Sequence, residues 1–285
     1  MLWSNQKGQG DAGMIFASDL DRTLIYSKRA IEEFGVPEGL TLTPVEQKDG
    51  SFAAFMTETS YNQLKELSDH SLFVPVTTRT TEQFRRFFIF AQDIRIKYAI
   101  TSNGANILYQ GLPMKEWSKQ IRDQLKIETV SQAELLSTLE REGVCLEGER
   151  KQAEEWFFYF LLDCFPSNSE RKSIEGLAAK SGWRISLQGR KLYFIPQAIS
   201  KGNALAFICE LEGVKTVAGA GDSLLDWDFL KNCQHRFVPS HGELAKHLAN
   251  MSISGTSILT LNSGIGAGEE ITQQLLQLFH SNPIF

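Results

Sequence analysis

Short, uniformly apolar runs separated by amphipathic segments recur at both ends of this 285-residue chain. Runs of this kind are typical of strands that are buried on both faces of a parallel sheet, because helices cover each face. The pattern therefore predicts an α/β fold with a doubly wound, Rossmann-like parallel sheet. The predicted strands lie at 14–18, 72–78, 98–102, 214–220 and 235–240, and the predicted helices lie around 61–67, 82–91, 203–211 and 225–231.

The rhythm changes between about Trp117 and Pro196, where strand-like runs follow one another in pairs. Paired neighbouring strands favour an antiparallel sheet with helices on one face. We therefore predict a small α+β cap domain at 117–196, inserted into a catalytic core made of 1–116 and 197–285. Its predicted elements are a helix at 118–142, strands at 144–148 and 155–163, a helix at 167–181, and strands at 183–188 and 191–196.

Composition limits the kinds of partner. Asp and Glu total 34 against 29 Lys and Arg, so the net charge is −5 and no broad basic surface for nucleic acid or anionic lipid is expected. The four cysteines form no CxxC pair, which is typical of reduced thiols. No apolar run is long enough to span a bilayer, and the first residues lack the apolar segment of a signal peptide. We expect a soluble cytoplasmic protein, either a monomer or a small homo-oligomer.

Polar residues follow the predicted core strands, at the edge where open parallel sheets bind their ligands. Asp19 and Asp21 come directly after the first strand, and two carboxylates so close together repel unless a cation or a proton lies between them. The sequence therefore predicts a partner for these carboxylates at this edge, either a cation or a proton. The other polar residues at strand ends or helix starts are Thr77, Thr78, Asn103, Lys201, Asp222 and Asp226, with Gly104 beside Asn103.

Several of these residues also have ordinary structural interpretations. Thr78 is interpreted as a cap for the following helix, and Asp226 as either a helix-start residue or a metal ligand. Lys201 alone would be a solvated charge, but beside three carboxylates it is expected to neutralise them. Arg22 and Arg79 are interpreted as surface charges.

Four motifs appear in order: DxDxT at 19–23, a strand-end Thr77, Lys201, and GDSxxD at 221–226. With these and the SNGA sequence at 102–105, the chain resembles the haloacid dehalogenase superfamily, in the Cof-type or sucrose-phosphatase-like branch with a type-II cap. Two positions depart from the Cof-type pattern. Thr78 stands where Gly is usual, and Leu225 stands where Asn is common.

The resemblance implies a Mg²⁺-dependent phosphatase that acts on a small phosphorylated metabolite, with a sugar phosphate as a candidate, through an aspartyl-phosphate intermediate. It makes Asp19 the nucleophile and Asp21 the general acid and base. Thr77 would hydrogen-bond the phosphoryl group, and Lys201 would stabilise its charge. The residues implied as metal ligands are Asp19, Asp21 through its carbonyl, Asp222 and Asp226.

Substrate contacts are expected from Thr78, Asn103, Gly104 and, on the cap, Arg190. Two other functions fit the same residues. A sugar phosphomutase would use the same nucleophile, and a non-catalytic regulatory or binding protein could share the fold. The intact set of Asp19, Asp21, Lys201 and Asp222 argues against the non-catalytic alternative.

Overall fold

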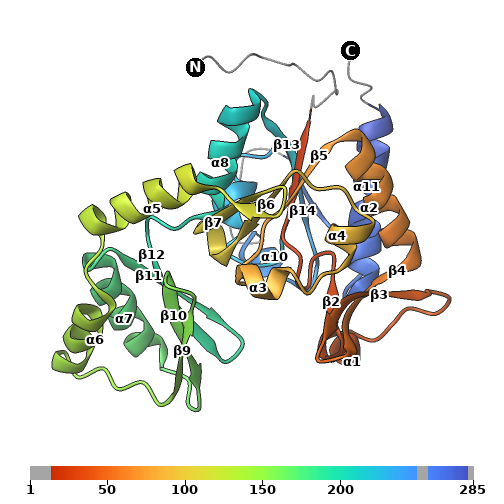
Figure 1. Cartoon of the computed structure of the whole chain (residues 1–285). Helices are drawn as coiled ribbons and strands as arrows, with labels where there is room; N and C mark the ends of the chain where they lie inside the picture. The colour runs from red at the N-terminus through yellow and green to blue at the C-terminus, as the bar shows by residue number, and fades with distance from the viewer. Residues whose placement is uncertain (1–13, 249–255, 282–285) are drawn as a thin grey trace, which may run out of the picture.

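The computed structural model of the protein describes residues 14–248 and 256–281, and a five-stranded parallel sheet lies at its centre (Figure 1). The predicted doubly wound parallel core is confirmed. β6 (Tyr98–Thr101) joins the segment after β5 (Leu72–Pro75) through a parallel bridge between Val76 and Ile100. β7 (Asn106–Tyr109) pairs antiparallel with β6, and β8 (Leu112–Pro113) pairs antiparallel with β7. The order of the central sheet is β15 (Thr256–Leu259), β14 (His235–Val238), β13 (Thr216–Ala220), β1 (Ile15–Ser18) and β5 (Leu72–Pro75).

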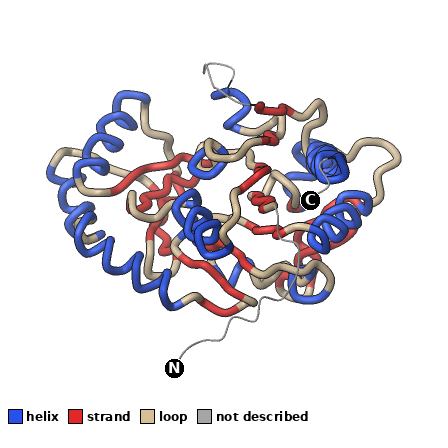
Figure 2. Tube along the Cα trace, turned by 90° about the horizontal axis from the view of Figure 1, so that it is seen from above, coloured by secondary structure: helices blue, strands red, loops and turns tan. Residues whose placement is uncertain are grey.

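Helices cover both faces of this sheet (Figure 2), and the side chains of β1 show how. Ile15 belongs to a buried cluster with Leu205 of α8 (Lys201–Glu212). Phe16 points to the opposite face, into a cluster with Leu64 of α2 (Glu58–His70) and Ile271 of α11 (Ile265–Ser281). Both faces of the strand are therefore buried, as its uniformly apolar sequence predicts. The short helices α9 (Trp227–Leu230) and α10 (Glu243–Leu248) complete the C-terminal half.

The segment between β1 and α2 forms structure that the sequence analysis did not predict. It consists of β2 (Tyr26–Ser27), α1 (Lys28–Phe34), β3 (Leu42–Lys48) and β4 (Ser51–Thr57), and the strands pair in the order β2-β4-β3. Asp49 and Gly50 both have positive φ, at 49° and 76°, as the tight turn between β3 and β4 requires. This Asp-Gly pair was a local signal for the hairpin.

Three predicted elements differ from the structure. The helix predicted at 82–91 is two short ones, α3 (Thr81–Phe84) and α4 (Ile89–Gln92). The helix predicted at 118–142 is also divided, into α5 (Lys115–Glu128) and α6 (Gln132–Arg141), because the Ser131 side chain accepts from the Glu134 N–H and starts a new helix. The strand predicted at 144–148 is wrong. β9 (Gly148–Ala153) follows it and is polar, as edge strands commonly are.

We use "cap" for the unit made of α5 to α7 and β9 to β12. It has an antiparallel sheet in the order β11-β12-β10-β9, and α6 and α7 cover the face of this sheet that points away from the core (Figure 1). Phe158 stacks on Phe194 within this layer, with ring centroids 4.9 Å apart. The boundaries at 117 and 196 stay a prediction. The bounds not yet given are β10 (Phe157–Leu162), α7 (Asn168–Lys180), β11 (Trp183–Gln188) and β12 (Lys191–Pro196).

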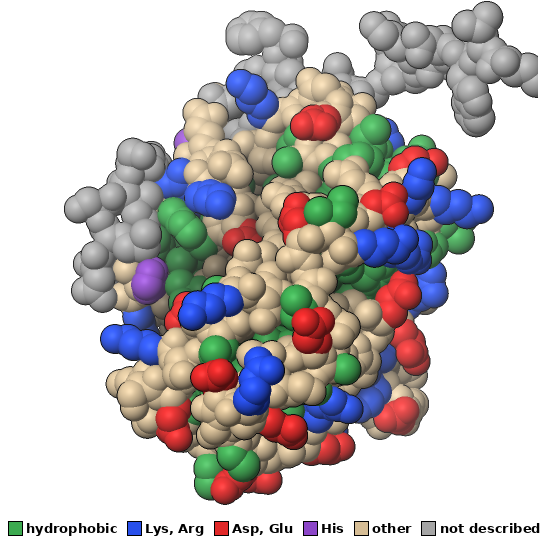
Figure 3. All heavy atoms as spheres, turned by 90° about the vertical axis from the view of Figure 1, so that its left-hand side faces the viewer, with side chains coloured by type: hydrophobic (Ala, Val, Ile, Leu, Met, Phe, Trp, Pro, Cys, Tyr) green, Lys and Arg blue, Asp and Glu red, His purple; other side chains and the backbone are tan. Residues whose placement is uncertain are grey.

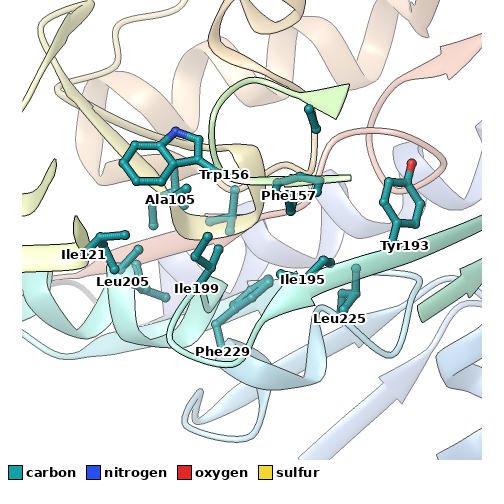
Figure 4. Close-up of a cluster of buried hydrophobic side chains, with 14 of the residues drawn as sticks. Ala105, Ile121, Trp156, Phe157, Tyr193, Ile195, Ile199, Leu205, Leu225 and Phe229 are labelled. Carbon is teal, nitrogen blue, oxygen red and sulfur yellow. The ribbon is translucent and has the colours of Figure 1, made fainter. Parts of the chain in front are cut away.

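The opposite side of the cap sheet meets the core through buried apolar side chains (Figure 4). Trp156 and Phe157, at the start of β10, belong to the same continuous cluster as Leu205 and Phe229 of the core. We call this contact the cap–core seam. It buries apolar surface of both units together, so the cap is docked on the core in this structure.

The outer surface carries charges of both signs. On the side formed by the cap, acidic and basic side chains are interspersed rather than gathered by sign (Figure 3). None of the helices in the described ranges combines the length and apolar character needed to cross a bilayer. All four cysteines are free.

His241, in the loop after β14, supports the turn that follows the first strand. Its Nε2 lies 3.0 Å from the carbonyl oxygen of Arg22, and its Nδ1 accepts a hydrogen bond from the Gly264 N–H at 3.1 Å. A ring that accepts at Nδ1 and donates at Nε2 is neutral. Arg22 has φ of 65°, so His241 holds a backbone conformation that side-chain residues rarely adopt. Burial lowers the pKa of His241 below its ordinary value. The hydrogen bond to the Arg22 carbonyl acts in the opposite direction but does not outweigh burial.

Acid should therefore weaken the fold through His241. The unfolded chain takes up a proton near the ordinary histidine pKa of 6.5, whereas the folded chain resists it. Stability should be lost as the pH falls below 6.5 and toward the lower folded-state pKa. We expect the melting temperature of the wild type to fall more steeply between pH 7 and 5 than that of His241→Gln. His280→Gln, at an exposed position, is the control and should keep the wild-type slope. Parallel curves for wild type and His241→Gln would refute this role.

Candidate active site

A buried lysine joins two carboxylates at the carboxyl edge of the central sheet. Lys201 Nζ lies 2.9 Å from Asp19 Oδ1 and 2.6 Å from Asp226 Oδ1, and the Lys201 side chain is only 1% exposed. Asp19 directly follows β1, Lys201 is the first residue of α8, and Asp226 directly precedes α9. The structure therefore brings together three of the predicted residues from distant parts of the chain.

Asp226 serves as a support for this lysine. Its second oxygen, Oδ2, accepts hydrogen bonds from the backbone N–H and the hydroxyl of Ser223, at 2.9 and 2.8 Å. With Lys201 on Oδ1, both oxygens of this fully buried carboxylate have partners. Asp226 directly precedes α9 but its side chain makes no cap hydrogen bond to that helix, and its role as a metal ligand stays a prediction.

Asp19, Asp222 and Asp226 form an acidic group whose ligand oxygens lie within 4.8 Å of one another. Burial raises the pKa of Asp19 to about 7, although Lys201 acts in the opposite direction. Burial, and then the charge of Asp19, raise the pKa of Asp222 well above its ordinary value. The nearest cation to Asp222 is Arg22, at 4.0 Å. One buried ammonium faces three carboxylates, so a divalent cation would fit the excess of negative charge.

Asp21 lies outside this acidic group and is held by an arginine. Arg79 donates to both of its oxygens, from Nε and Nη2, at 2.7 Å each. The same guanidinium contacts Glu46 of β3 at 2.6 Å and lies 4.1 Å from the centroid of the Phe87 ring. The interpretation of Arg79 as a surface charge is therefore wrong, because its side chain is only 13% exposed and fully engaged. Arg22, with a side chain 40% exposed and paired with Glu33, is closer to that interpretation.

Thr77 is fully buried at the end of β5. Its backbone N–H donates to the Ile100 carbonyl at 2.9 Å, and its hydroxyl oxygen accepts from the Arg79 N–H at 3.1 Å. The prediction that Thr78 caps the following helix is wrong. The cap is Thr80, because its hydroxyl oxygen accepts from the Gln83 N–H and the Gln83 side chain accepts from the Thr80 N–H.

Asn103 and Gly104 lie in the turn η1 (Ser102–Gly104), between Thr77 and the start of α8. The Asn103 N–H donates to the Thr77 carbonyl at 3.0 Å, and neither polar atom of its buried side chain has a hydrogen-bond partner among residues 14–248 and 256–281. Gly104 has φ of 101°, and a Cβ there would collide with the Ser200 backbone. Only glycine permits this approach of the turn to α8.

Arg190 lies at the turn between β11 and β12, at an exposed position of the cap. It donates to the Leu162 carbonyl at 2.8 Å and pairs with Asp163 at 3.0 Å. These bonds are within the cap and do not lead to the acidic group. Its role in substrate binding stays a prediction.

Sequence reasoning missed Arg79 and Glu46 as parts of the site. Glu46 lies in the hairpin that was not predicted, so no local pattern linked it to Asp21. Arg79 stands two residues after Thr77, at the end of a core strand, and that position was the available signal.

Comparisons with known proteins identify the family and the fold of the chain. The chain matches the family described as sucrose-6F-phosphate phosphohydrolase over residues 12–238. Among curated protein sequences, no match is found. The sucrose-phosphatase of Synechocystis, solved in complex with sucrose and phosphate, has a similar structure with a TM-score of 0.65 and 13% identity, over 92% of this chain and 98% of that one.

Two further solved structures share the fold. A haloacid dehalogenase-like hydrolase from Bacillus subtilis has a TM-score of 0.55 and 16% identity, over 94% of this chain and 92% of that one. A trehalose-6-phosphate phosphatase related protein has a TM-score of 0.52 and 14% identity, over 94% and 99%. The family match covers most of the chain, including all four motifs. The chain therefore belongs to the sucrose-6F-phosphate phosphohydrolase family of haloacid dehalogenase-like enzymes, which makes it a phosphoric monoester hydrolase.

Proposed function

We propose that this protein is a Mg²⁺-dependent phosphatase that hydrolyses a phosphorylated sugar through a phosphorylated Asp19. The observation that carries the proposal is the buried Lys201 between Asp19 and Asp226, which pairs with Oδ1 of Asp19 and leaves Oδ2 with a hydrogen bond from the Thr23 hydroxyl at 3.3 Å, within the acidic group that includes Asp222. That oxygen is the one available to attack phosphorus.

Asp19 acts as the nucleophile. A carboxylate oxygen of Asp19 forms a bond to phosphorus as the bond from phosphorus to the sugar oxygen breaks, and an acyl phosphate results. Water then attacks this acyl phosphate, which releases inorganic phosphate and regenerates the carboxylate. Lys201 remains paired with the other oxygen and stabilises the negative charge of the transition state.

Asp21 supplies and removes the protons. It donates a proton to the departing sugar oxygen and takes one from the attacking water. The two hydrogen bonds from Arg79 hold its carboxylate in one orientation. Glu46 also accepts from Arg79, at 2.6 Å, and so holds the guanidinium in place beside Asp21.

The phosphoryl group is bound by groups around Asp19. The hydroxyl of Thr77 would donate to the phosphoryl group, and the amide of Asn103, whose backbone N–H donates to the Thr77 carbonyl, would offer a donor and an acceptor in the adjoining turn. Thr78, next to Thr77, and Gly104, next to Asn103, are expected to contact substrate through backbone or hydroxyl groups.

Asp19 and Asp222 would hold Mg²⁺, with the carbonyl of Asp21 as a further oxygen ligand. Asp19 is buried and shares Lys201 with Asp226, whereas Asp222 is partly buried and has Arg22 at 4.0 Å, so the group keeps an excess of negative charge that suits an ion preferring oxygen ligands. When bound, the ion would screen the charge of the phosphoryl group from Asp19 and Asp222. Asp226, although predicted as a ligand, is proposed here to position Lys201.

The cap would select the sugar. Tyr159 and Tyr193 lie opposite each other on the core-facing side of the cap sheet, with ring centroids 5.1 Å apart, and Lys191 lies 5.6 Å from the Tyr159 ring centroid. Burial raises the pKa of Tyr193, and the charges that also act on it include those of Asp21 and Lys201. Aromatic and cationic groups over the catalytic edge suit a phosphorylated sugar.

The free cysteines are consistent with a cytoplasmic location.

Asp19→Asn should lower the hydrolysis of p-nitrophenyl phosphate by about 10³-fold or more, because the amide is not a nucleophile. The measurement is the steady-state release of inorganic phosphate, which also distinguishes hydrolysis from phosphoryl transfer by a mutase. Asp163→Asn, at an exposed position of the cap, is the control and should retain wild-type rates. Comparable turnover by folded Asp19→Asn would exclude Asp19 as nucleophile.

Asp21→Asn should slow substrates with poor leaving groups most. An alkoxide needs a proton as it departs, whereas p-nitrophenolate does not. We expect the loss of kcat to be at least about tenfold larger for an alkyl phosphate than for p-nitrophenyl phosphate. The comparison of the two kcat ratios tests the acid role, and equal losses on both substrates would contradict it.

Removal of divalent metal by a chelator should abolish activity reversibly, and Mg²⁺ should restore it. Ca²⁺ should restore much less, because its longer bonds and higher coordination number misplace the ligands. A second readout does not depend on activity. Mg²⁺ should raise the melting temperature of the wild type but not that of Asp222→Asn. Full activity in excess chelator, or an equal thermal shift in both proteins, would rule out this metal site.

A further inference from the structure

One side chain of the cap reaches into the core and binds there. Glu154 lies in the turn between β9 and β10, and its carboxylate accepts three hydrogen bonds from core residues. Oε1 accepts from the Thr81 N–H at 2.9 Å, and Oε2 accepts from the Ser102 hydroxyl at 2.7 Å and from Asn106 Nδ2 at 2.6 Å. Across 14–248 and 256–281, no lysine or arginine forms an ion pair with it. Because its donors are neutral, this carboxylate is held by the geometry of its hydrogen bonds rather than by attraction to a cation.

The three donors come from different core elements. Thr81 starts α3, Ser102 lies in η1, and Asn106 starts β7. They are also linked to one another, because Asn106 Nδ2 lies 3.3 Å from the Thr81 hydroxyl oxygen and 3.4 Å from that of Ser102. Glu154 therefore ties together the segments on both sides of the η1 turn.

The η1 turn has a strained backbone that depends on contacts with neighbouring residues. Ser102, Asn103 and Gly104 have consecutive positive φ values of 50°, 58° and 101°, which residues other than glycine rarely adopt. Such a conformation persists only where surrounding contacts hold it. The Asn103 amide, buried and without a hydrogen-bond partner, is the group that this turn presents between Thr77 and the start of α8.

The direction of the Glu154 side chain is set by its own backbone conformation and by the burial of Trp156, two residues later. Its φ is 51°, again in the left-handed region. Two residues later, Trp156 is 6% exposed and is part of the cap–core seam. The tip of the β9–β10 hairpin therefore enters the core with an apolar anchor and a polar contact side by side.

We propose that Glu154 is a positioning residue that makes the conformation of the Asn103 turn depend on docking of the cap. With the cap docked, its carboxylate holds Ser102 and Asn106, and the Asn103 amide is presented to the phosphoryl group. When the cap moves away, the three donors lose their acceptor together and the turn relaxes. This inference rests on the proposed function, because it assigns the Asn103 amide to the substrate phosphate.

The test compares Glu154→Ala and Glu154→Gln with the control Glu155→Gln. Glu155 is the adjacent residue, 62% exposed, and its ion pair with Arg122 at 3.2 Å lies at the surface. The first measurement is hydrogen–deuterium exchange of peptides that cover 98–109, without ligand. We expect faster exchange in Glu154→Ala, an intermediate rate in Glu154→Gln, which keeps one acceptor oxygen, and the wild-type rate in Glu155→Gln.

The second measurement is the affinity for inorganic phosphate, by calorimetry, together with KM and kcat for p-nitrophenyl phosphate. Glu154→Ala should weaken phosphate binding about tenfold and raise KM more than it lowers kcat, because the nucleophile is untouched. Ser102→Ala removes one of the same bonds from the core side. The Glu154→Ala/Ser102→Ala double variant should therefore be less impaired than the sum of the two single losses.

Each outcome decides the proposal. Exchange in Glu154→Ala equal to that in Glu155→Gln would overturn the contact, and additive losses in the double variant would do the same. Faster exchange with unchanged phosphate affinity would overturn the positioning role. If the wild type hydrolyses no phosphate ester but the exchange and phosphate-binding results are as expected, the proposed function fails while the inference about Glu154 stands.

Discussion

The burial of the Lys201 ammonium is the constraint on which the catalytic edge depends. A buried cation is costly unless it is paired and hydrogen-bonded, and Lys201 meets this condition only because Asp19 and Asp226 arrive from two other elements. Burial alone would lower the pKa of Lys201, but the charges of the two aspartates outweigh it and raise that pKa. The pairing therefore fixes the ends of β1, α8 and the loop before α9 relative to one another. Gly202 permits the close packing, since a Cβ there would collide with the Asp228 backbone.

The same constraint explains why the site suits a cation and an anion in turn. Lys201 compensates for only part of the charge of Asp19, Asp222 and Asp226, and negative charge remains on a buried or partly buried group of carboxylates. A divalent ion bound there would relieve that excess. With such an ion and Lys201 both in place, the charge of an incoming phosphoryl group would be balanced.

The sequence allowed prediction of those parts of the site that follow core strands. The runs that end before Asp19, Thr77 and Asp222 are uniformly apolar, so their topology placed these residues at one edge. Contacts made by residues in other contexts could not be predicted. Glu46 reaches Arg79 from an antiparallel hairpin, and Glu154 reaches Ser102 from a cap turn, across separations of 33 and 52 residues. No periodic pattern relates such positions, because the pairs form only once the tertiary fold has formed. The polar edge strand β9 was misplaced for a related reason, since its residues do not alternate in hydrophobicity.

Two kinds of contact join the cap to the core, and they differ in what they can do. The cap–core seam around Trp156 and Phe157 buries apolar surface, which is stabilising but insensitive to orientation. Hydrogen bonds depend on distance and angle, so the bonds of Glu154 distinguish the fully docked cap from one displaced by a fraction of an ångström. Arg184 of β11 makes a second polar contact of this kind, an ion pair with Asp228 of α9 at 2.7 Å. The apolar seam thus holds the cap near the core, and the polar contacts of Glu154 and Arg184 fix its orientation on the core.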